Sequence, residues 1–243
     1  MIIDPSSHYD DAYWSAAKTY RYRNPDGSIE ERVYHGPALW WDGAAQLCDA
    51  LLMALDIAPG ASLLDIGCGA GCFTAGFQRR GLDAYGVDIS EYAVSKAPTA
   101  VRGRIFHGDA LDGELPEPLR RSFDLCAAFD IVEHIYAPDQ PKLWRAFDRT
   151  GAKTLLLDIG TAHHESEIWV HEAGKPVPLA HEVTAVSGHV LVQTIAFWRT
   201  HARTWGWQPD DDAMAKFEAW RAATPAYDQL IAWGPLHLLL LRR

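Results

Sequence analysis

The chain has 243 residues, of which 48% are hydrophobic and 22% charged, so it can bury a substantial core as one domain with appendages. Its formal net charge of -10 disfavours attraction to phosphate backbones and anionic lipids, which argues against nucleic acid or a membrane as the main partner. The first residues lack the features of a secretory signal, and the longest apolar run, 235–241, is too short to cross a bilayer, so we expect a cytoplasmic protein.

Residues 1–45 differ in pattern from the rest of the chain. They place tyrosines and tryptophans among polar and turn residues, and they include the turn signal NPDGS. We expect this segment to form an aromatic-rich N-terminal cap or lid, and residues 46–243 to form the main domain.

Short apolar runs and amphipathic segments alternate from about residue 60. The runs predict strands at 62–67, 83–90, 104–110, 123–132 and 153–160, and the segments between them predict helices at 70–81, 91–98 and 138–151. This alternation is typical of βαβ units, in which a parallel sheet is covered by helices on both faces.

The second half of the chain contains a histidine-rich stretch at about 160–190, with glycine and proline breaks. It lacks the HExxH spacing of a helical zinc site, so a zinc site is not predicted here. We expect this stretch instead to form an insertion beside a ligand pocket. Helices are then predicted at 194–207 and 210–223, with a terminal strand in 235–243. Four cysteines without paired spacing predict reduced structural thiols: Cys48, Cys68, Cys72 and Cys126.

The stretch LLDIGCGAG, at 63–71, joins the first strand of the alternating region to its helix. A dinucleotide-binding turn reads GxGxxG, but Cys72 stands where the third glycine belongs, and the glycines here read GxGxG. Asp65 precedes the first of them by two residues. This carboxylate would repel a pyrophosphate, whereas it would suit a ligand that carries an ammonium and a sulfonium.

This stretch resembles motif I of the class I S-adenosylmethionine-dependent methyltransferases. The resemblance implies an α/β fold, a Rossmann-like three-layer sandwich whose seven-stranded, mostly parallel sheet has its last strand antiparallel. It implies S-adenosylmethionine as the cofactor, and it implies roles along the strand ends: motif I would hold the amino acid end, the next acid the ribose, and the acid after the third strand the adenine. The residues implied are Asp65, Gly67, Cys68 and Gly69, then Asp88 and Ile89, then Asp109 and Ala110, with Phe129 and Trp41 also beside the cofactor. Tyr22 is an alternative to Trp41 in the cap.

The predicted reaction is methyl transfer to a small molecule or a saccharide, with oxygen as the acceptor atom. His134, just after the fourth strand, is the first candidate for the general base, and His189 is the second. The spacing of Asp130, Glu133 and His134 resembles the metal-binding segment of ubiquinone-biosynthesis O-methyltransferases. The same letters occur in metal-free relatives, so no metal is predicted.

Two other functions remain open at this stage. A nicotinamide-dependent oxidoreductase would share the acid at Asp88, but Cys72 and Asp65 disfavour it. A non-catalytic protein with a methyltransferase fold, which binds a cofactor or a partner, is the other alternative. The sequence leaves open the acceptor's identity, the choice between O- and N-methylation, whether a divalent metal takes part at Asp130, Glu133 and His134, and the oligomeric state.

Overall fold

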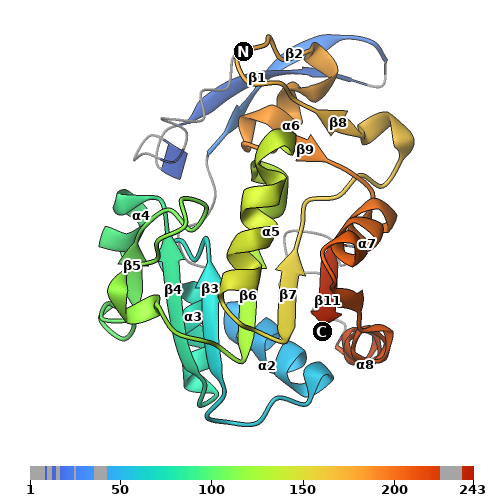
Figure 1. Ribbon diagram of the computed structural model, residues 1–243. Helices are drawn as coiled ribbons and strands as arrows, with labels where there is room; N and C mark the ends of the chain where they lie inside the picture. The colour runs from blue at the N-terminus through green and yellow to red at the C-terminus, as the bar shows by residue number, and fades with distance from the viewer. Residues whose placement is uncertain (1–8, 10–12, 15–16, 25, 36–42, 225–236) are drawn as a thin grey trace.

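The computed structural model describes residues 9, 13–14, 17–24, 26–35, 43–224 and 237–243. Its centre is a seven-stranded sheet in the order β10-β11-β7-β6-β3-β4-β5 (Figure 1). The strands of this sheet are β3 (Ser62–Ile66), β4 (Asp83–Asp88), β5 (Ile105–His107), β6 (Leu125–Phe129), β7 (Thr154–Asp158), β10 (Gln208–Pro209) and β11 (Leu238–Arg242).

The directions of the strands match the predicted fold class. The pairs β3–β4, β3–β6, β4–β5 and β6–β7 are parallel, and β11 runs antiparallel to both β7 and β10. The carboxyl ends of the parallel strands therefore lie at one edge of the sheet, where ligands of open α/β sheets bind. The predicted seven-stranded, mostly parallel sheet with an antiparallel last strand is confirmed.

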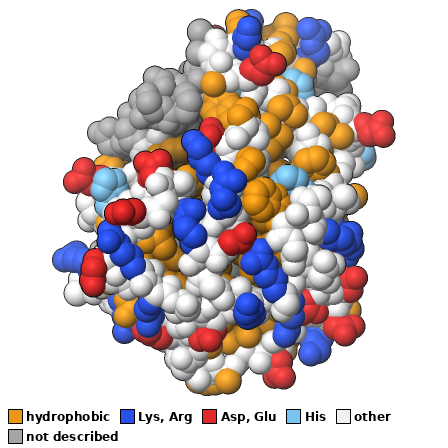
Figure 2. Space-filling model, in the orientation of Figure 1, with side chains coloured by type: hydrophobic (Ala, Val, Ile, Leu, Met, Phe, Trp, Pro, Cys, Tyr) orange, Lys and Arg blue, Asp and Glu red, His pale blue; other side chains and the backbone are white. Residues whose placement is uncertain are grey.

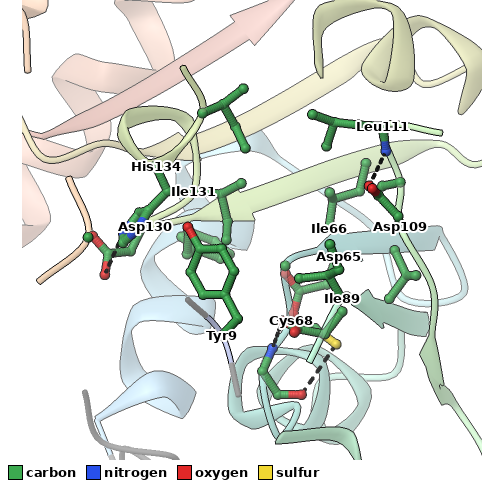
Figure 3. Close-up of a pocket in the computed structure, with 18 of the residues that line it drawn as sticks. Tyr9, Asp65, Ile66, Cys68, Ile89, Asp109, Leu111, Asp130, Ile131 and His134 are labelled. Carbon is green, nitrogen blue, oxygen red and sulfur yellow. Dashed lines mark hydrogen bonds and ion pairs between the residues drawn. The ribbon is translucent and has the colours of Figure 1, made fainter. Parts of the chain in front are cut away.

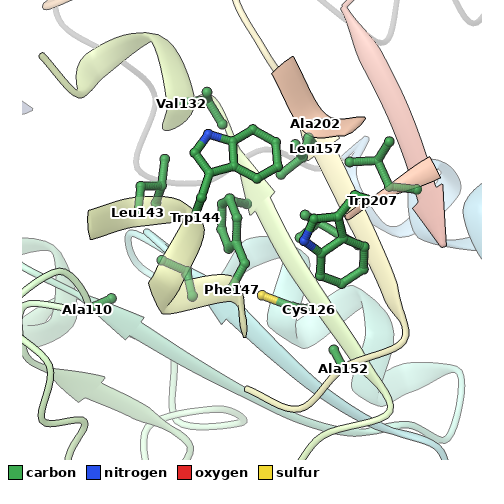
Figure 4. Close-up of a cluster of buried hydrophobic side chains, with 14 of the residues drawn as sticks. Ala110, Cys126, Val132, Leu143, Trp144, Phe147, Ala152, Leu157, Ala202 and Trp207 are labelled. Carbon is green, nitrogen blue, oxygen red and sulfur yellow. The ribbon is translucent and has the colours of Figure 1, made fainter. Parts of the chain in front are cut away.

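Helices cover both faces of the sheet because its strands are apolar on both faces. One core packs α2 (Ala44–Leu55), α3 (Cys72–Arg79) and α8 (Asp211–Ala223) against side chains such as Leu156 and Leu240. The opposite core packs α5 (Gln140–Arg149) and α7 (Ile195–Thr204) against the alternate side chains Leu155 and Leu239. Figure 4 shows Trp144, Phe147 and Trp207 in this second core, and all three are buried.

A second layer of structure lies beyond the carboxyl ends of the strands (Figure 1). It consists of the hairpin β1 (Lys18–Arg23) and β2 (Ile29–Tyr34), the pair β8 (Trp169–Val170) and β9 (Leu191–Val192), and α6 (Glu182–Val186). Arg21 joins the hairpin to α6, since its backbone N–H donates to Glu182 Oε2 at 2.8 Å and its guanidinium also binds that carboxylate. The hairpin turns at the predicted NPDGS signal.

The remaining main-chain elements are short, and several predicted elements end earlier in the structure than the sequence indicated. A helix, α4 (Glu91–Ser95), follows β4, and a 3-10 turn, η2 (Val132–His134), follows β6. The helix predicted at 194–207 ends at Thr204, because Gly206 has a left-handed φ of 79° and the chain then enters β10. No helix in the described ranges is long and apolar enough to cross a membrane.

Candidate functional site

One cavity lies at the carboxyl ends of β3, β4, β5 and β6 (Figure 3). Asp109 and Leu111 stand at one end of the view, whereas Asp130 and His134 stand at the other. The cavity brings together predicted residues from four strand ends: Asp65, Gly67, Cys68, Gly69, Asp88, Ile89, Asp109, Ala110, Phe129 and His134. Trp41 lies outside the described residues.

The glycine-rich turn has a conformation that other residues rarely adopt. Gly67, Gly69 and Gly71 have φ values of 74°, 55° and 86°, all in the left-handed region. A methyl group at Gly67 would overlap the side chain of Ile131, and one at Gly71 would lie 2.7 Å from Ile105 Cδ1. The chain's own conformation and packing therefore require these glycines, so a nearby ligand is not the only reason for them.

Asp65 is a buried carboxyl in the wall of the cavity. It is 1% exposed, and its Oδ2 accepts a hydrogen bond of 2.8 Å from Thr74 Oγ1. Burial raises the pKa of Asp65 to about 7, although the bond from Thr74 acts in the opposite direction. A cation in the cavity would stabilise the ionised form, so this position suits the ammonium of an amino acid.

Asp88 is held rigidly by the backbone at the end of β4. Its Oδ2 accepts from the Gly69 N–H and its Oδ1 from the Ser90 N–H, both at 2.7 Å. Burial raises the pKa of Asp88, and these two bonds oppose the shift. Ile89, the next residue, is 50% exposed and offers an apolar surface to a ligand. A fixed carboxylate beside an apolar side chain fits a ribose joined to a base.

The end of β5 supplies a third acid. Asp109 Oδ1 accepts from the Leu111 N–H at 2.8 Å, which fixes the carboxylate at the cavity wall. The carbonyl of Ala110 accepts a 2.8 Å bond from Arg149 Nη2. Phe129 stacks on Phe73 with ring centroids 4.2 Å apart, so Phe73 fixes the position of the Phe129 ring.

A group of acids and histidines closes the other end of the cavity. Asp130 Oδ1 lies 3.5 Å from His189 Nε2, and Asp130 Oδ2 lies 4.0 Å from His134 Nε2. The two imidazole rings are 4.8 Å apart, centroid to centroid. His134 lines the cavity, whereas His189 lies behind Asp130 and is not among its described lining residues. The two predicted histidines thus share one carboxylate.

The charges in this group are distributed unevenly. Burial alone would raise the pKa of Asp130, but the bond to His189 and the nearby His134 outweigh it and hold that pKa below its ordinary range. Burial and the repulsion of Asp130 raise the pKa of Glu133 well above its usual value. Asp130 therefore carries the negative charge and Glu133 the proton, while Glu133 Oε1 accepts from the Gly160 N–H.

The same group has the composition of a cation site. One ligand atom from each of Asp130, Glu133, His134 and His189 lies within 4.8 Å of the others. Carboxylate oxygens and imidazole nitrogens would suit a divalent ion. The arrangement also serves as a hydrogen-bonded acid-base group, so the prediction that no metal takes part stays a prediction.

Three aromatic residues of the N-terminal segment line the cavity: Tyr9, Tyr13 and Trp14. The Tyr9 ring lies 6.0 Å from that of His134, and Trp14 Nε1 donates to Ser90 Oγ at 3.0 Å. Sequence reasoning noted this aromatic cluster but selected Trp41 and Tyr22. Tyr22 is not among the described lining residues, and its ring instead lies 3.7 Å from the Arg32 guanidinium carbon.

The residues that the histidine-rich stretch contributes to the described lining of the cavity are not histidines. Gly188 and Val190 line it, whereas no histidine from 160–190 is among the described lining residues. The rings of His171 and His181 each lie 5.1 Å from that of Trp169. The end of this stretch therefore lies at the cavity, and its role as an insertion at the acceptor pocket stays a prediction.

Known proteins resemble part of this chain. Residues 64–153 match the family model described as a methyltransferase domain. The magnesium-protoporphyrin O-methyltransferase of Rhodobacter capsulatus is 33% identical over 39% of this chain and 42% of its own length. The ubiquinone biosynthesis O-methyltransferase of Hahella chejuensis is 30% identical over 41% of this chain and 47% of its own length. The chain thus matches less than half the length of each relative.

A solved structure extends the likeness of the fold. The crystal structure of magnesium protoporphyrin IX methyltransferase from Synechocystis PCC 6803, with bound S-adenosylhomocysteine, superposes with a TM-score of 0.54. The match covers 83% of this chain and 84% of that one at 15% sequence identity, which establishes a shared fold.

Proposed function

The chain carries a methyltransferase domain of the class I S-adenosylmethionine-dependent type, and we propose that it transfers a methyl group to a small molecule or saccharide. The acceptor atom we propose is oxygen. The matched relative from Rhodobacter capsulatus is an O-methyltransferase, and the histidine and carboxylate pair described above suits removal of a hydroxyl proton.

The observation that carries the proposal is the convergence of three acids on one cavity. Asp65, Asp88 and Asp109 come from the ends of three neighbouring parallel strands and all line it. Asp65 would bind the ammonium of S-adenosylmethionine, Asp88 the ribose hydroxyls and Asp109 the adenine edge. The bound cofactor supplies a methyl group already activated on a sulfonium.

The protein's remaining tasks are to align the acceptor, exclude water and remove a proton. His134 is the cavity residue placed to accept that proton. Asp130, ionised and within 4.0 Å of His134 Nε2, would stabilise the imidazolium that results. His189 acts through Asp130, since it contacts that carboxylate and is not among the described lining residues, and is therefore a positioning residue.

Calorimetry tests the cofactor site directly. We expect S-adenosylhomocysteine to bind and NAD not to bind. Asp88→Ala should weaken binding by about 1.5 to 3 kcal/mol for each charge-assisted hydrogen bond lost to the ribose. Asp112→Ala is the matched control, since Asp112 is exposed and is not among the described lining residues. Equal affinities for wild type and Asp88→Ala would remove Asp88 from the site.

Turnover distinguishes an enzyme from a binding protein. Pools of hydroxyl-bearing small molecules and saccharides would be incubated with S-adenosylmethionine, and formation of S-adenosylhomocysteine would be measured. Product that requires both the pool and His134 supports the proposal. Tight cofactor binding without turnover on any pool would favour the non-catalytic alternative.

A further inference from the structure

The end of the cavity near His134 is built mostly from aromatic and aliphatic groups. We call this part the acceptor end and define it by six of the lining residues, beside which Asp130 also lines the cavity: Tyr9, Tyr13, His134, Tyr136, Gly188 and Val190. Burial, and after it the nearby charges of Asp88 and Asp130, raise the pKa of Tyr9. Its phenol is therefore neutral and faces carboxylates.

The cavity as a whole contains acids but no lysine or arginine. Five aspartates line it: Asp65, Asp88, Asp109, Asp130 and Asp139. All 22 lysines and arginines of the sequence lie within the described ranges, and none is among the residues that line the cavity. The segments outside those ranges contain neither residue type, so they have no such cation to contribute.

Three cations contact residues of the wall without lining the described cavity themselves, and one of them, Arg149, donates to the carbonyl of Ala110 at 2.8 Å. The ammonium of Lys18 lies 4.6 Å from the ring centroid of Tyr13, and Lys142 pairs with Asp139 at 2.9 Å. Neither residue lines the cavity among those described. Proteins bind phosphate and carboxylate groups with arginine, lysine or a helix N-terminus, and burying such an anion without a partner is costly. The N-terminus of α3, where Cys72 lines the cavity, follows directly on motif I and therefore belongs to the part assigned to the amino acid end of the cofactor.

We infer that the acceptor carries no phosphate or carboxylate, and that it is an apolar molecule bearing the hydroxyl to be methylated. The inference rests on the proposed function, because it concerns the molecule that His134 faces. Apolar walls bind such a molecule by burying its surface, whereas the charge of Asp130 repels an anion held in the same low-dielectric space.

Two fluorescent probes of nearly equal shape test this charge selection. N-phenyl-1-naphthylamine is neutral, and 8-anilinonaphthalene-1-sulfonate has the same ring system with one sulfonate. Each is titrated into the protein saturated with S-adenosylhomocysteine, and into the protein alone. We expect the neutral probe to bind about tenfold more tightly or better. Equal or tighter binding of the sulfonate would overturn the inference, and so would failure of both probes to bind.

Variants at the acceptor end establish where the selection arises. Tyr136→Lys adds a cation and should tighten sulfonate binding about tenfold, whereas Tyr136→Phe, the matched control, should leave the ratio of the two affinities unchanged. Tyr9→Lys is the second variant, to be used if the first does not fold. If a lysine variant folds and the ratio of the two probe affinities is unchanged, the charge selection does not arise in the cavity, and the inference is wrong. Failure of S-adenosylhomocysteine to bind would instead contradict the proposed function, and the titrations without it would still report the charge selection.

Discussion

Replacing Asp65 by asparagine should make the protein more stable at pH 8 while weakening its cofactor site. The side chain is buried, and burial places its pKa at about 7 instead of the ordinary 3.8. The folded protein therefore binds this proton more tightly than the unfolded chain does. As a result, the free energy of unfolding falls as the pH rises between these two pKa values and levels off above about 7.

The size of the effect follows from the two pKa values. At pH 8 the raised pKa makes the folded protein about 4 kcal/mol less stable than it would be if Asp65 kept its ordinary pKa, since one pKa unit corresponds to about 1.4 kcal/mol. Between pH 5 and pH 8 the free energy of unfolding of the wild type should fall by about 3 kcal/mol because of Asp65. The asparagine side chain of the variant has no such proton to lose, so the variant should gain that amount relative to wild type over the same interval.

Urea unfolding followed by the fluorescence of the ten tryptophans measures the difference at each pH. Asp158→Asn is the matched control, because burial also raises the pKa of Asp158 to about 7 but Asp158 is not among the described cavity residues. Both variants should gain stability at pH 8, and only Asp65→Asn should weaken S-adenosylhomocysteine binding. A stability difference independent of pH would refute the reasoning, as would equal cofactor affinities.

Three further outcomes test the acid-base group. His134→Ala should lower kcat about 100-fold to 10,000-fold in steady-state assays while calorimetry shows unchanged cofactor affinity; near-full activity would return His134 to a structural role. Gly160→Ala should destabilise the fold by about 1 to 3 kcal/mol in urea unfolding and also lower kcat, because its methyl would lie 2.7 Å from Glu133 Oε1 and from His189 Cε1; wild-type stability would contradict that packing. Treatment with EDTA should leave turnover intact, since the hydrogen bond with His189 already stabilises the ionised Asp130; loss restored by magnesium or manganese would assign the group to a metal.

Local patterns in the sequence predicted most of the fold. Alternating apolar runs and helical segments indicated the parallel strands, because a strand buried on both faces must be apolar throughout. The stretch LLDIGCGAG and the acids that follow two later strands indicated Asp65, Asp88 and Asp109. Parallel strands bring their carboxyl ends to one edge, so residues far apart in sequence meet there without any long-range signal.

Only the tertiary structure determined which side chains complete the cavity. The sequence of the aromatic N-terminal segment did not show which of its residues would line the cavity, because the position of the segment depends on contacts with distant residues. It therefore gave no reason to choose Tyr9, Tyr13 and Trp14 over Trp41 and Tyr22. His189 likewise meets Asp130 only after the chain has crossed the histidine-rich insertion. Periodicity reports which face of an element is buried, but it carries no information on which distant group will lie against that face. The sequence by itself therefore determined the strand-end acids, and the folded chain decided what surrounds them.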